Sequence, residues 1–217
     1  MAKPILYGVN RSPAVRTVLL TAAAMGLDLE LKEVDVATNE HRTDEFLSKN
    51  PQHTIPTLED GGNCIWDSHA IATYLIGKYA EDDSLYPKDL YTRAVINQRL
   101  HFESGVLFPA VRVLRVAQNQ RNFEKLQESK RLILQAYDFL EKFLVNDLYM
   151  AGDTLTVADL SLVSSLSTAN CFFPIDSSQF PKLNQWLIRM SELPYYQEAN
   201  GNGLQNLIAF VQKIENS

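Results

Sequence analysis

The chain has 217 residues, 46% of them hydrophobic, so it is long enough to bury the core of one large domain or of two smaller ones. Its formal net charge of −6 argues against nucleic acid or an anionic membrane surface as a partner, because phosphate groups repel an acidic protein. Nine glycines and nine prolines are ordinary contents, which excludes a fibrous repeat and a long disordered tail.

The first 80 residues alternate between strand and helix patterns. A strand is predicted at residues 4–9, a helix at 14–25 that ends at Gly26, and a second strand at 29–36. Strand, crossover helix and strand in succession favour a parallel pair with a right-handed connection.

A polar helix is predicted at residues 43–49, followed by two short strands at 57–58 and 63–66. The segment between these strands, Glu59-Asp60-Gly61-Gly62, is a strong hairpin turn because glycine tolerates positive φ. Another helix is expected from Ser68 to Tyr79. The resulting order, β-α-β-α-β-β-α, is the thioredoxin-like topology.

The second half shows helical periodicity only. The chain is therefore expected to form a domain at 1–80, a linker at 81–90 and an all-helical domain at 91–217. The helical patterns cover residues 91–121, 124–146, 157–169, 181–192 and 204–214. The first pattern is unusually long, so either Pro109 kinks it or a partner chain shares the helix.

A folding signal precedes the pattern at 157–169. Thr156 and Asp159 have the spacing of a capping box, and Leu155 can pack on Leu160 as a hydrophobic staple. Capping accounts for the position of Asp159, so we assign this carboxylate no catalytic role.

Cysteine and histidine positions bear on the compartment and on metals. Cys64 and Cys171 are far apart and each is followed by two apolar residues, which predicts two buried thiols in a reducing compartment. Neither a leader pattern nor an apolar run of about 18 residues is found, so a cytoplasmic protein is expected. The four histidines, His41, His53, His69 and His101, lack metal-ligand spacing, so no metal is expected.

Ser12 is the first candidate for chemistry. It follows the first strand and precedes Pro13, which suits the first position of a helix, so one interpretation is a helix cap. Thioredoxin-like redox proteins carry Cys-x-x-Cys in this loop, whereas this chain has Ser12-Pro13-Ala14-Val15, which excludes disulfide exchange here. A serine hydroxyl at a helix N-terminus can instead donate to a thiolate that a ligand brings.

Two further segments suit peptide recognition. Pro56 is well placed to be cis, which exposes the main chain of Ile55 for pairing with an extended peptide; the alternative is an ordinary trans proline at an edge strand. Ser68 is expected to cap the next helix, whose free N–H groups suit a carboxylate, and Asp67 offers a counter-charge for an ammonium group. A carboxylate and an ammonium group together form the α-amino-acid end of a peptide.

These motifs match, in order and spacing, those of the cytosolic glutathione transferases of delta and epsilon type, and the chain most resembles the insect epsilon class. The matching segments are residues 7–16, 50–59, 67–71, 100–105, 156–159 and 193–201. The resemblance implies the glutathione transferase fold, in which a thioredoxin-like α/β N-terminal domain is followed by an all-α C-terminal domain.

The resemblance also implies residue roles. Ser12 is the catalytic residue, which hydrogen-bonds the glutathione sulfur. His41 and His53 contact the glycyl carboxylate, and Asp67 with Ser68 holds the γ-glutamyl end. The full implied glutathione site is His41, His53, Thr54, Ile55, Pro56, Asp67, Ser68, His69 and Arg112. The implied hydrophobic substrate pocket is lined by Phe108, Val111, Arg112, Arg115, Leu207 and Phe210.

The implied activity is transfer of glutathione, as co-substrate, to small hydrophobic electrophiles in detoxification, with dehydrochlorination or peroxide reduction as variants, by a cytoplasmic homodimer. Two alternatives stay open: a glutathione-dependent isomerase of an endogenous metabolite, and a non-catalytic ligand-binding protein.

Two positions depart from the family. Asp67 stands where glutamate is common, and Arg115 stands where apolar or aromatic residues are common, which puts a broad hydrophobic substrate range in doubt.

Overall fold

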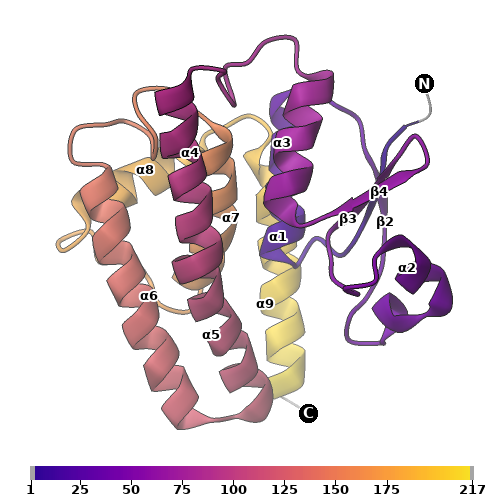
Figure 1. Ribbon diagram of the computed structural model, residues 1–217. Helices are drawn as coiled ribbons and strands as arrows, with labels where there is room; N and C mark the ends of the chain where they lie inside the picture. The colour runs from indigo at the N-terminus through magenta and orange to yellow at the C-terminus, as the bar shows by residue number, and fades with distance from the viewer. Residues whose placement is uncertain (1–2, 216–217) are drawn as a thin grey trace.

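The computed structural model describes residues 3–215, so the outer limits assigned to the domains, residues 1 and 217, lie outside the described residues. Figure 1 shows a small sheet with its helices beside a bundle of longer helices. The chain passes from one part to the other between α3 (Ser68–Tyr79) and α4 (Leu90–Phe102). A thioredoxin-like α/β part followed by an all-helical part is the predicted architecture.

Four strands form one mixed sheet in the order β2-β1-β3-β4. They are β1 (Ile5–Tyr7), β2 (Glu30–Lys32), β3 (Thr57–Asp60) and β4 (Asn63–Trp66). β1 pairs with β2 in parallel and with β3 antiparallel, so Leu6 lies opposite Leu31 on one side and Leu58 on the other. The first two strands are shorter than predicted, because only three residues of each, 5–7 and 30–32, pair in the ladder.

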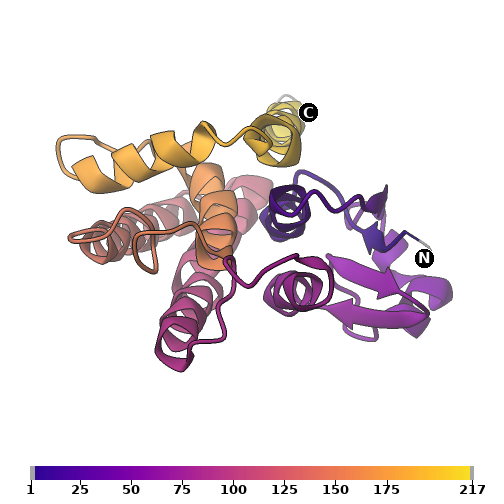
Figure 2. The ribbon, with the colours of Figure 1, turned by 90° about the horizontal axis from the view of Figure 1, so that it is seen from above.

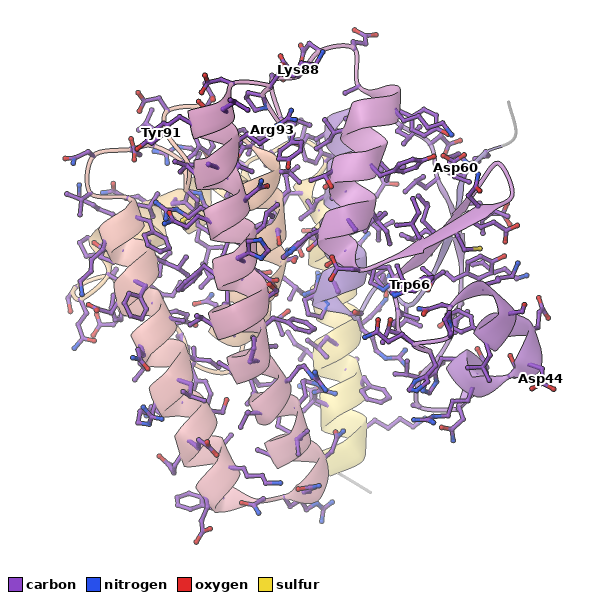
Figure 3. The ribbon with its side chains drawn as sticks, in the orientation of Figure 1. Asp44, Asp60, Trp66, Lys88, Tyr91 and Arg93 are labelled. Carbon is purple, nitrogen blue, oxygen red and sulfur yellow. The ribbon has the colours of Figure 1, made fainter. Side chains whose placement is uncertain are left out.

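The hairpin between β3 and β4 is tighter than predicted. Asp60 belongs to the strand and pairs with Asn63, so only Gly61 and Gly62 form the loop, both at positive φ. Asp60 also ties the hairpin to α3, since its carboxylate accepts from Tyr74 Oη over 2.9 Å and from Lys78 Nζ over 2.7 Å. Figure 3 shows Asp60 next to the C-terminal half of that helix.

Alternate side chains of β1 face different helices. Leu6 packs with residues of α1 (Pro13–Ala24) and α3, whereas Tyr7 packs on Phe46 of α2 (Asp44–Lys49) with 6.2 Å between the ring centroids. α1 and α3 therefore lie between the sheet and the bundle, and α2 covers the outer side (Figure 2). A short loop, residues 8–12, connects β1 to α1. Because α1 lies next to the bundle, Ser12 at the end of this loop lies at the boundary of the two parts.

The long helical pattern at 91–121 is three elements. α4 is followed by a π-helical segment, η2 (Glu103–Leu107), and then by α5 (Phe108–Gln120). Pro109 lies in the first turn of α5. Because proline has no N–H, it cannot donate the hydrogen bond to the carbonyl four residues earlier that a regular α-helix across residues 103–107 requires. The remaining elements are α6 (Phe123–Phe143), α7 (Val157–Asn170), α8 (Pro181–Ser191), the π-helical η3 (Gln197–Gly201) and α9 (Asn202–Glu215).

α7 forms the centre of the helical part. Every residue from Val157 to Ala169 is buried, because other elements surround the helix (Figure 2). The predicted capping box is present at its start, and buried Asp159 does more than cap. One carboxylate oxygen accepts from Thr156 N, and the other accepts from Met150 N over 2.8 Å and from Trp186 Nε1 over 2.9 Å. Asp159 thus joins three segments of the core.

The prediction of two buried thiols is wrong. Cys64 is half-buried in β4, and Cys171 is exposed, because it lies where α7 ends and the chain leaves the core. Both cysteines are free. Within residues 3–215, no helix has the length and apolar character required to cross a bilayer.

Candidate active site

Ser12 occupies the N-cap position of α1. Its amide donates to the Val9 carbonyl over 3.0 Å, and its own carbonyl accepts from Arg16 N over 3.0 Å. The hydroxyl, however, does not cap the helix, and within the described part of the chain it has no hydrogen-bond partner. Ser12 is therefore the cap residue by position, as one interpretation had it, but its side chain does not cap, and Oγ stays free to donate to a ligand.

A buried arginine holds the Ser12 loop in place. Arg16 is fully buried, and its guanidinium donates to the Asn10 carbonyl over 3.3 Å and to the Arg11 carbonyl over 3.0 Å. The same group reaches Ser164 O of α7 over 2.9 Å and Asn200 Oδ1 of η3 over 2.8 Å. Burial lowers the pKa of Arg16 to about 10, so it is charged at neutral pH. The loop is thus fixed to the helical part.

Ser12 lines a cavity of about 400 Å³ between the two parts of the molecule. The N-terminal part contributes Ser12 and Ile55, and α5, α7 and α9 form the opposite wall. All six residues predicted for the hydrophobic substrate surround this cavity: Phe108, Val111, Arg112, Arg115, Leu207 and Phe210. The cavity therefore joins the serine to a largely apolar space, with Arg112 and Arg115 on the α5 wall and Arg11 on the N-terminal side.

Two histidines of the N-terminal part lie close together. His41 belongs to a short 3-10 helix (Glu40–Arg42) that was not predicted, and its ring centroid is 5.9 Å from that of His53. The imidazole of His41 is buried, yet its Nδ1 has no hydrogen-bond partner among the described residues. Burial, helped by Arg42 and His53, lowers the pKa of His41 and favours the neutral ring. Because buried polar atoms usually have a hydrogen-bond partner, this nitrogen can pair with water or with a polar group of a ligand.

The loop before β3 has the predicted cis proline. The Ile55–Pro56 bond is cis, and Ile55 lines the cavity. Asn50, fully buried, holds the loop from inside by donating from Nδ2 to Thr54 O over 2.9 Å and to Thr57 Oγ1 over 2.9 Å. Thr54 is thus engaged in hydrogen bonds within the loop.

The start of α3 differs from the prediction in one respect. Asp67, not Ser68, is the cap: its Oδ1 accepts from His69 N over 3.0 Å and from Ala70 N over 3.1 Å. Those N–H groups were expected to be free for a carboxylate. Ser68 is the first helical residue, and its hydroxyl has no partner in the described structure. Asp67 has φ of 76°, a conformation that aspartate tolerates better than most residues.

The side chain of His69 points away from the Ser12 cavity. Its Nε2 lies 2.7 Å from Ser161 Oγ of α7 and 3.2 Å from Glu103 Oε2 of η2. Glu103 is itself buried and also accepts from Ser165. His69 therefore joins the two parts of the molecule and does not line the cavity.

Sequence reasoning did not assign roles to Arg16 and Asn50, the two residues that fix the loops. A charged residue inside the otherwise apolar helix pattern of 14–25 was a usable signal for Arg16. An asparagine directly before Pro51 was a weaker one for Asn50. In the described residues, no group of three or more His, Cys, Asp or Glu side chains is arranged to hold a metal ion.

Comparison with known proteins covers nearly the whole chain. Residues 2–76 match the model of the glutathione S-transferase N-terminal domain, and residues 102–194 match that of the C-terminal domain. Glutathione S-transferase 1 of Manduca sexta is 43% identical over 205 residues, which cover 91% of this chain and 92% of that protein.

Solved structures agree with this match. An epsilon-class glutathione S-transferase from the housefly, Musca domestica, is 50% identical with a TM-score of 0.93, and 98% of each chain is covered. A Drosophila glutathione transferase homologue whose structure contains bound glutathione is 46% identical, also with a TM-score of 0.93 and 98% coverage of each chain. The chain therefore belongs to the glutathione S-transferase family and is of the insect delta/epsilon type.

Proposed function

We propose that this transferase uses Ser12 to hold glutathione as a thiolate, which then attacks a hydrophobic electrophile bound against α5 and α9. The observation that carries this proposal is the free Ser12 hydroxyl, which lies at a helix N-terminus and opens into the cavity between the two parts. In a substitution, the sulfur–carbon bond forms as the leaving group departs with its electron pair. In an addition, the carbanion that forms takes a proton from solvent.

The required stabilisation is within reach of the groups at hand. A free thiol has a pKa of about 8.5, so only a few per cent is thiolate at neutral pH. Lowering that pKa by about two units corresponds to about 2.7 kcal/mol. A hydrogen bond to a charged acceptor supplies about 1.5–3 kcal/mol, and a helix N-terminus supplies about 0.3–1 kcal/mol. Ser12 can therefore act as a neutral donor without ionising.

The rest of glutathione is proposed to lie along the N-terminal part. The unpaired Nδ1 of His41, next to His53, supports binding of the glycyl carboxylate. The main chain of Ile55, before the cis Pro56, supports pairing with the cysteinyl residue. The free Ser68 hydroxyl and the second carboxylate oxygen of Asp67 support binding of the γ-glutamyl end.

Other assignments need adjustment. Arg112, exposed on the cavity wall, is proposed to lie at the edge of the glutathione site. For His69 we propose a positioning role, because its main-chain N–H and its ring are both engaged within the protein. Thr54 and Pro56 are proposed to act through the shape of their loop.

We further propose that the protein is a cytoplasmic homodimer with the domain limits given above, and that no metal takes part. Exposed apolar side chains at the start of α4 support a partner surface. Leu90 is 84% exposed and Tyr91 is 79% exposed, and Figure 3 shows Tyr91 on the outer side of the helix. Size-exclusion chromatography with light scattering would measure the oligomeric state.

Conjugation of a chlorodinitrobenzene tests the proposed function. We expect Ser12→Ala to keep its affinity for glutathione but to lose most of its kcat at neutral pH. Ser191→Ala, an exposed serine at the end of α8, is the matched control and should behave like the wild type. Unchanged kcat in Ser12→Ala would contradict the role of Ser12. Glutathione binding without turnover of any electrophile by the wild type would favour the non-catalytic alternative.

A further inference from the structure

The face of α5 that lines the cavity changes in chemistry along the helix. Phe108, Val111, Arg115 and Asn119 recur at intervals of three or four residues, and Arg112 lies beside Val111, which places all five on one face. Because each residue of an α-helix rises about 1.5 Å, the wall passes from Phe108 to Arg115 over about 10 Å. A ligand along this wall meets an apolar end and a cationic end.

Arg115 carries a charge that no carboxylate of residues 3–215 neutralises. Its side chain is half-buried, and its Nη1 donates to the neutral Gln118 Oε1 over 2.9 Å. Burial, reinforced by the nearby Arg11, lowers the pKa of Arg115. Arg11, in contrast, is paired with Asp35. A guanidinium has five N–H donors, so Arg115 keeps donors for a ligand.

Phe210 of α9 orients both guanidinium groups. The Cζ atom of Arg11 lies 4.6 Å from the centroid of the Phe210 ring, and that of Arg115 lies 5.9 Å from it. Cation–π attraction restrains a guanidinium near a ring while its in-plane N–H groups stay available. A pair of such N–H groups fits the two oxygens of a carboxylate.

We infer that this transferase selects electrophiles that combine an apolar body with a carboxylate, and that Arg115 binds the carboxylate. The inference rests on the proposed function, in which the cavity holds the electrophile. Glutathione also carries carboxylates, but their proposed partners lie on the N-terminal part and at Arg112. Arg115 lies one turn farther along α5 than Arg112, which leaves it for the second substrate.

Ethacrynic acid and its methyl ester test the inference, because they share one electrophilic double bond and differ in charge. The wild type is expected to have a higher kcat/KM for the acid. Arg115→Gln should lower kcat/KM for the acid about tenfold, the loss expected for one charge-assisted hydrogen bond. The ester should change less than about twofold, and the KM for glutathione should stay the same. Arg115→Lys should recover part of the preference for the acid.

Arg131→Gln removes one positive charge from the exposed surface of α6 and is the matched control. It should leave both substrates unchanged. An equal loss for acid and ester in Arg115→Gln would overturn the inference and assign Arg115 to cavity shape. A raised KM for glutathione would overturn it in favour of a glutathione contact, and an unchanged rate with the acid would also overturn it.

A binding measurement separates this inference from the proposed function. Dihydroethacrynic acid and its methyl ester lack the reactive double bond, so calorimetry reports their affinity without turnover. Failure of the wild type to conjugate either reactive compound would contradict the proposed function alone. Equal affinity of the wild type for the two unreactive compounds would contradict the role of Arg115 alone.

Discussion

Gly203→Ala is expected to displace the loop that carries Ser12. Gly203 is buried at the start of α9, and a Cβ atom there would lie 2.2 Å from Asn10 O and 2.7 Å from Arg16 Cδ. Real Cβ atoms essentially never approach other atoms closer than 3.0 Å, so the carbonyl must retreat by about 0.8 Å, the difference between these distances. A shift of about 1 Å at a catalytic group can cost about a hundredfold in rate.

We therefore expect kcat to fall by about tenfold to a hundredfold, and the free energy of unfolding to fall by about 1–3 kcal/mol from overpacking. Stopped-flow conjugation kinetics and urea unfolding measure the two effects. Gly77→Ala is the matched control: Gly77 lies in α3 with no atom within 4 Å of its Cβ position, so alanine should stabilise the helix by about 0.5–1 kcal/mol. Wild-type kcat and stability in Gly203→Ala would refute the tight packing of α9 on the Ser12 loop.

Three further predictions concern stability. Asp159→Ala should lower the free energy of unfolding by about 3 kcal/mol or more, measured in urea, because buried donors that include Trp186 Nε1 lose their acceptor. Arg16→Met removes the donors of the loop carbonyls, so it should lower the free energy of unfolding by about 3 kcal/mol and also lower kcat. A variant that is stable but inactive would limit the role of Arg16 to positioning the loop. The hydrogen bond from Lys49 lowers the pKa of Glu59 in the folded state. The contribution of this pair to the free energy of unfolding is therefore fully present above the unfolded-state pKa of about 4.3, and it is lost as the pH falls through the folded-state pKa. Acid unfolding curves should therefore be flatter in Glu59→Gln, and equal slopes would contradict this contribution.

The elements that could be predicted are those with local signals. The glycine pair at 61–62 requires a turn, and the Thr156–Asp159 spacing begins a helix whatever surrounds it. Strand, helix and strand in sequence then restrict the first part to one topology. Matching motifs on both halves also placed the six substrate-pocket residues around one cavity.

The features that could not be predicted depend on partners distant in the sequence or on backbone geometry. Arg16 receives its role from Ser164 and Asn200, which lie 148 and 184 residues away. Asp67, at a φ of 76°, caps α3 in place of Ser68, although either residue suits a cap by its type alone. Cys171 is followed by two phenylalanines yet is exposed, because the end of a buried helix is decided by packing and not by composition.

The pKa of bound glutathione reports directly whether Ser12 stabilises the thiolate. Titration of the ultraviolet absorbance of the thiolate in the binary complex reports this pKa without any electrophile. We expect a pKa about two units below the free thiol value of about 8.5 for the wild type, and a return close to 8.5 for Ser12→Ala with glutathione still bound. An equal, lowered pKa in both proteins would show that another group stabilises the thiolate and would contradict the account.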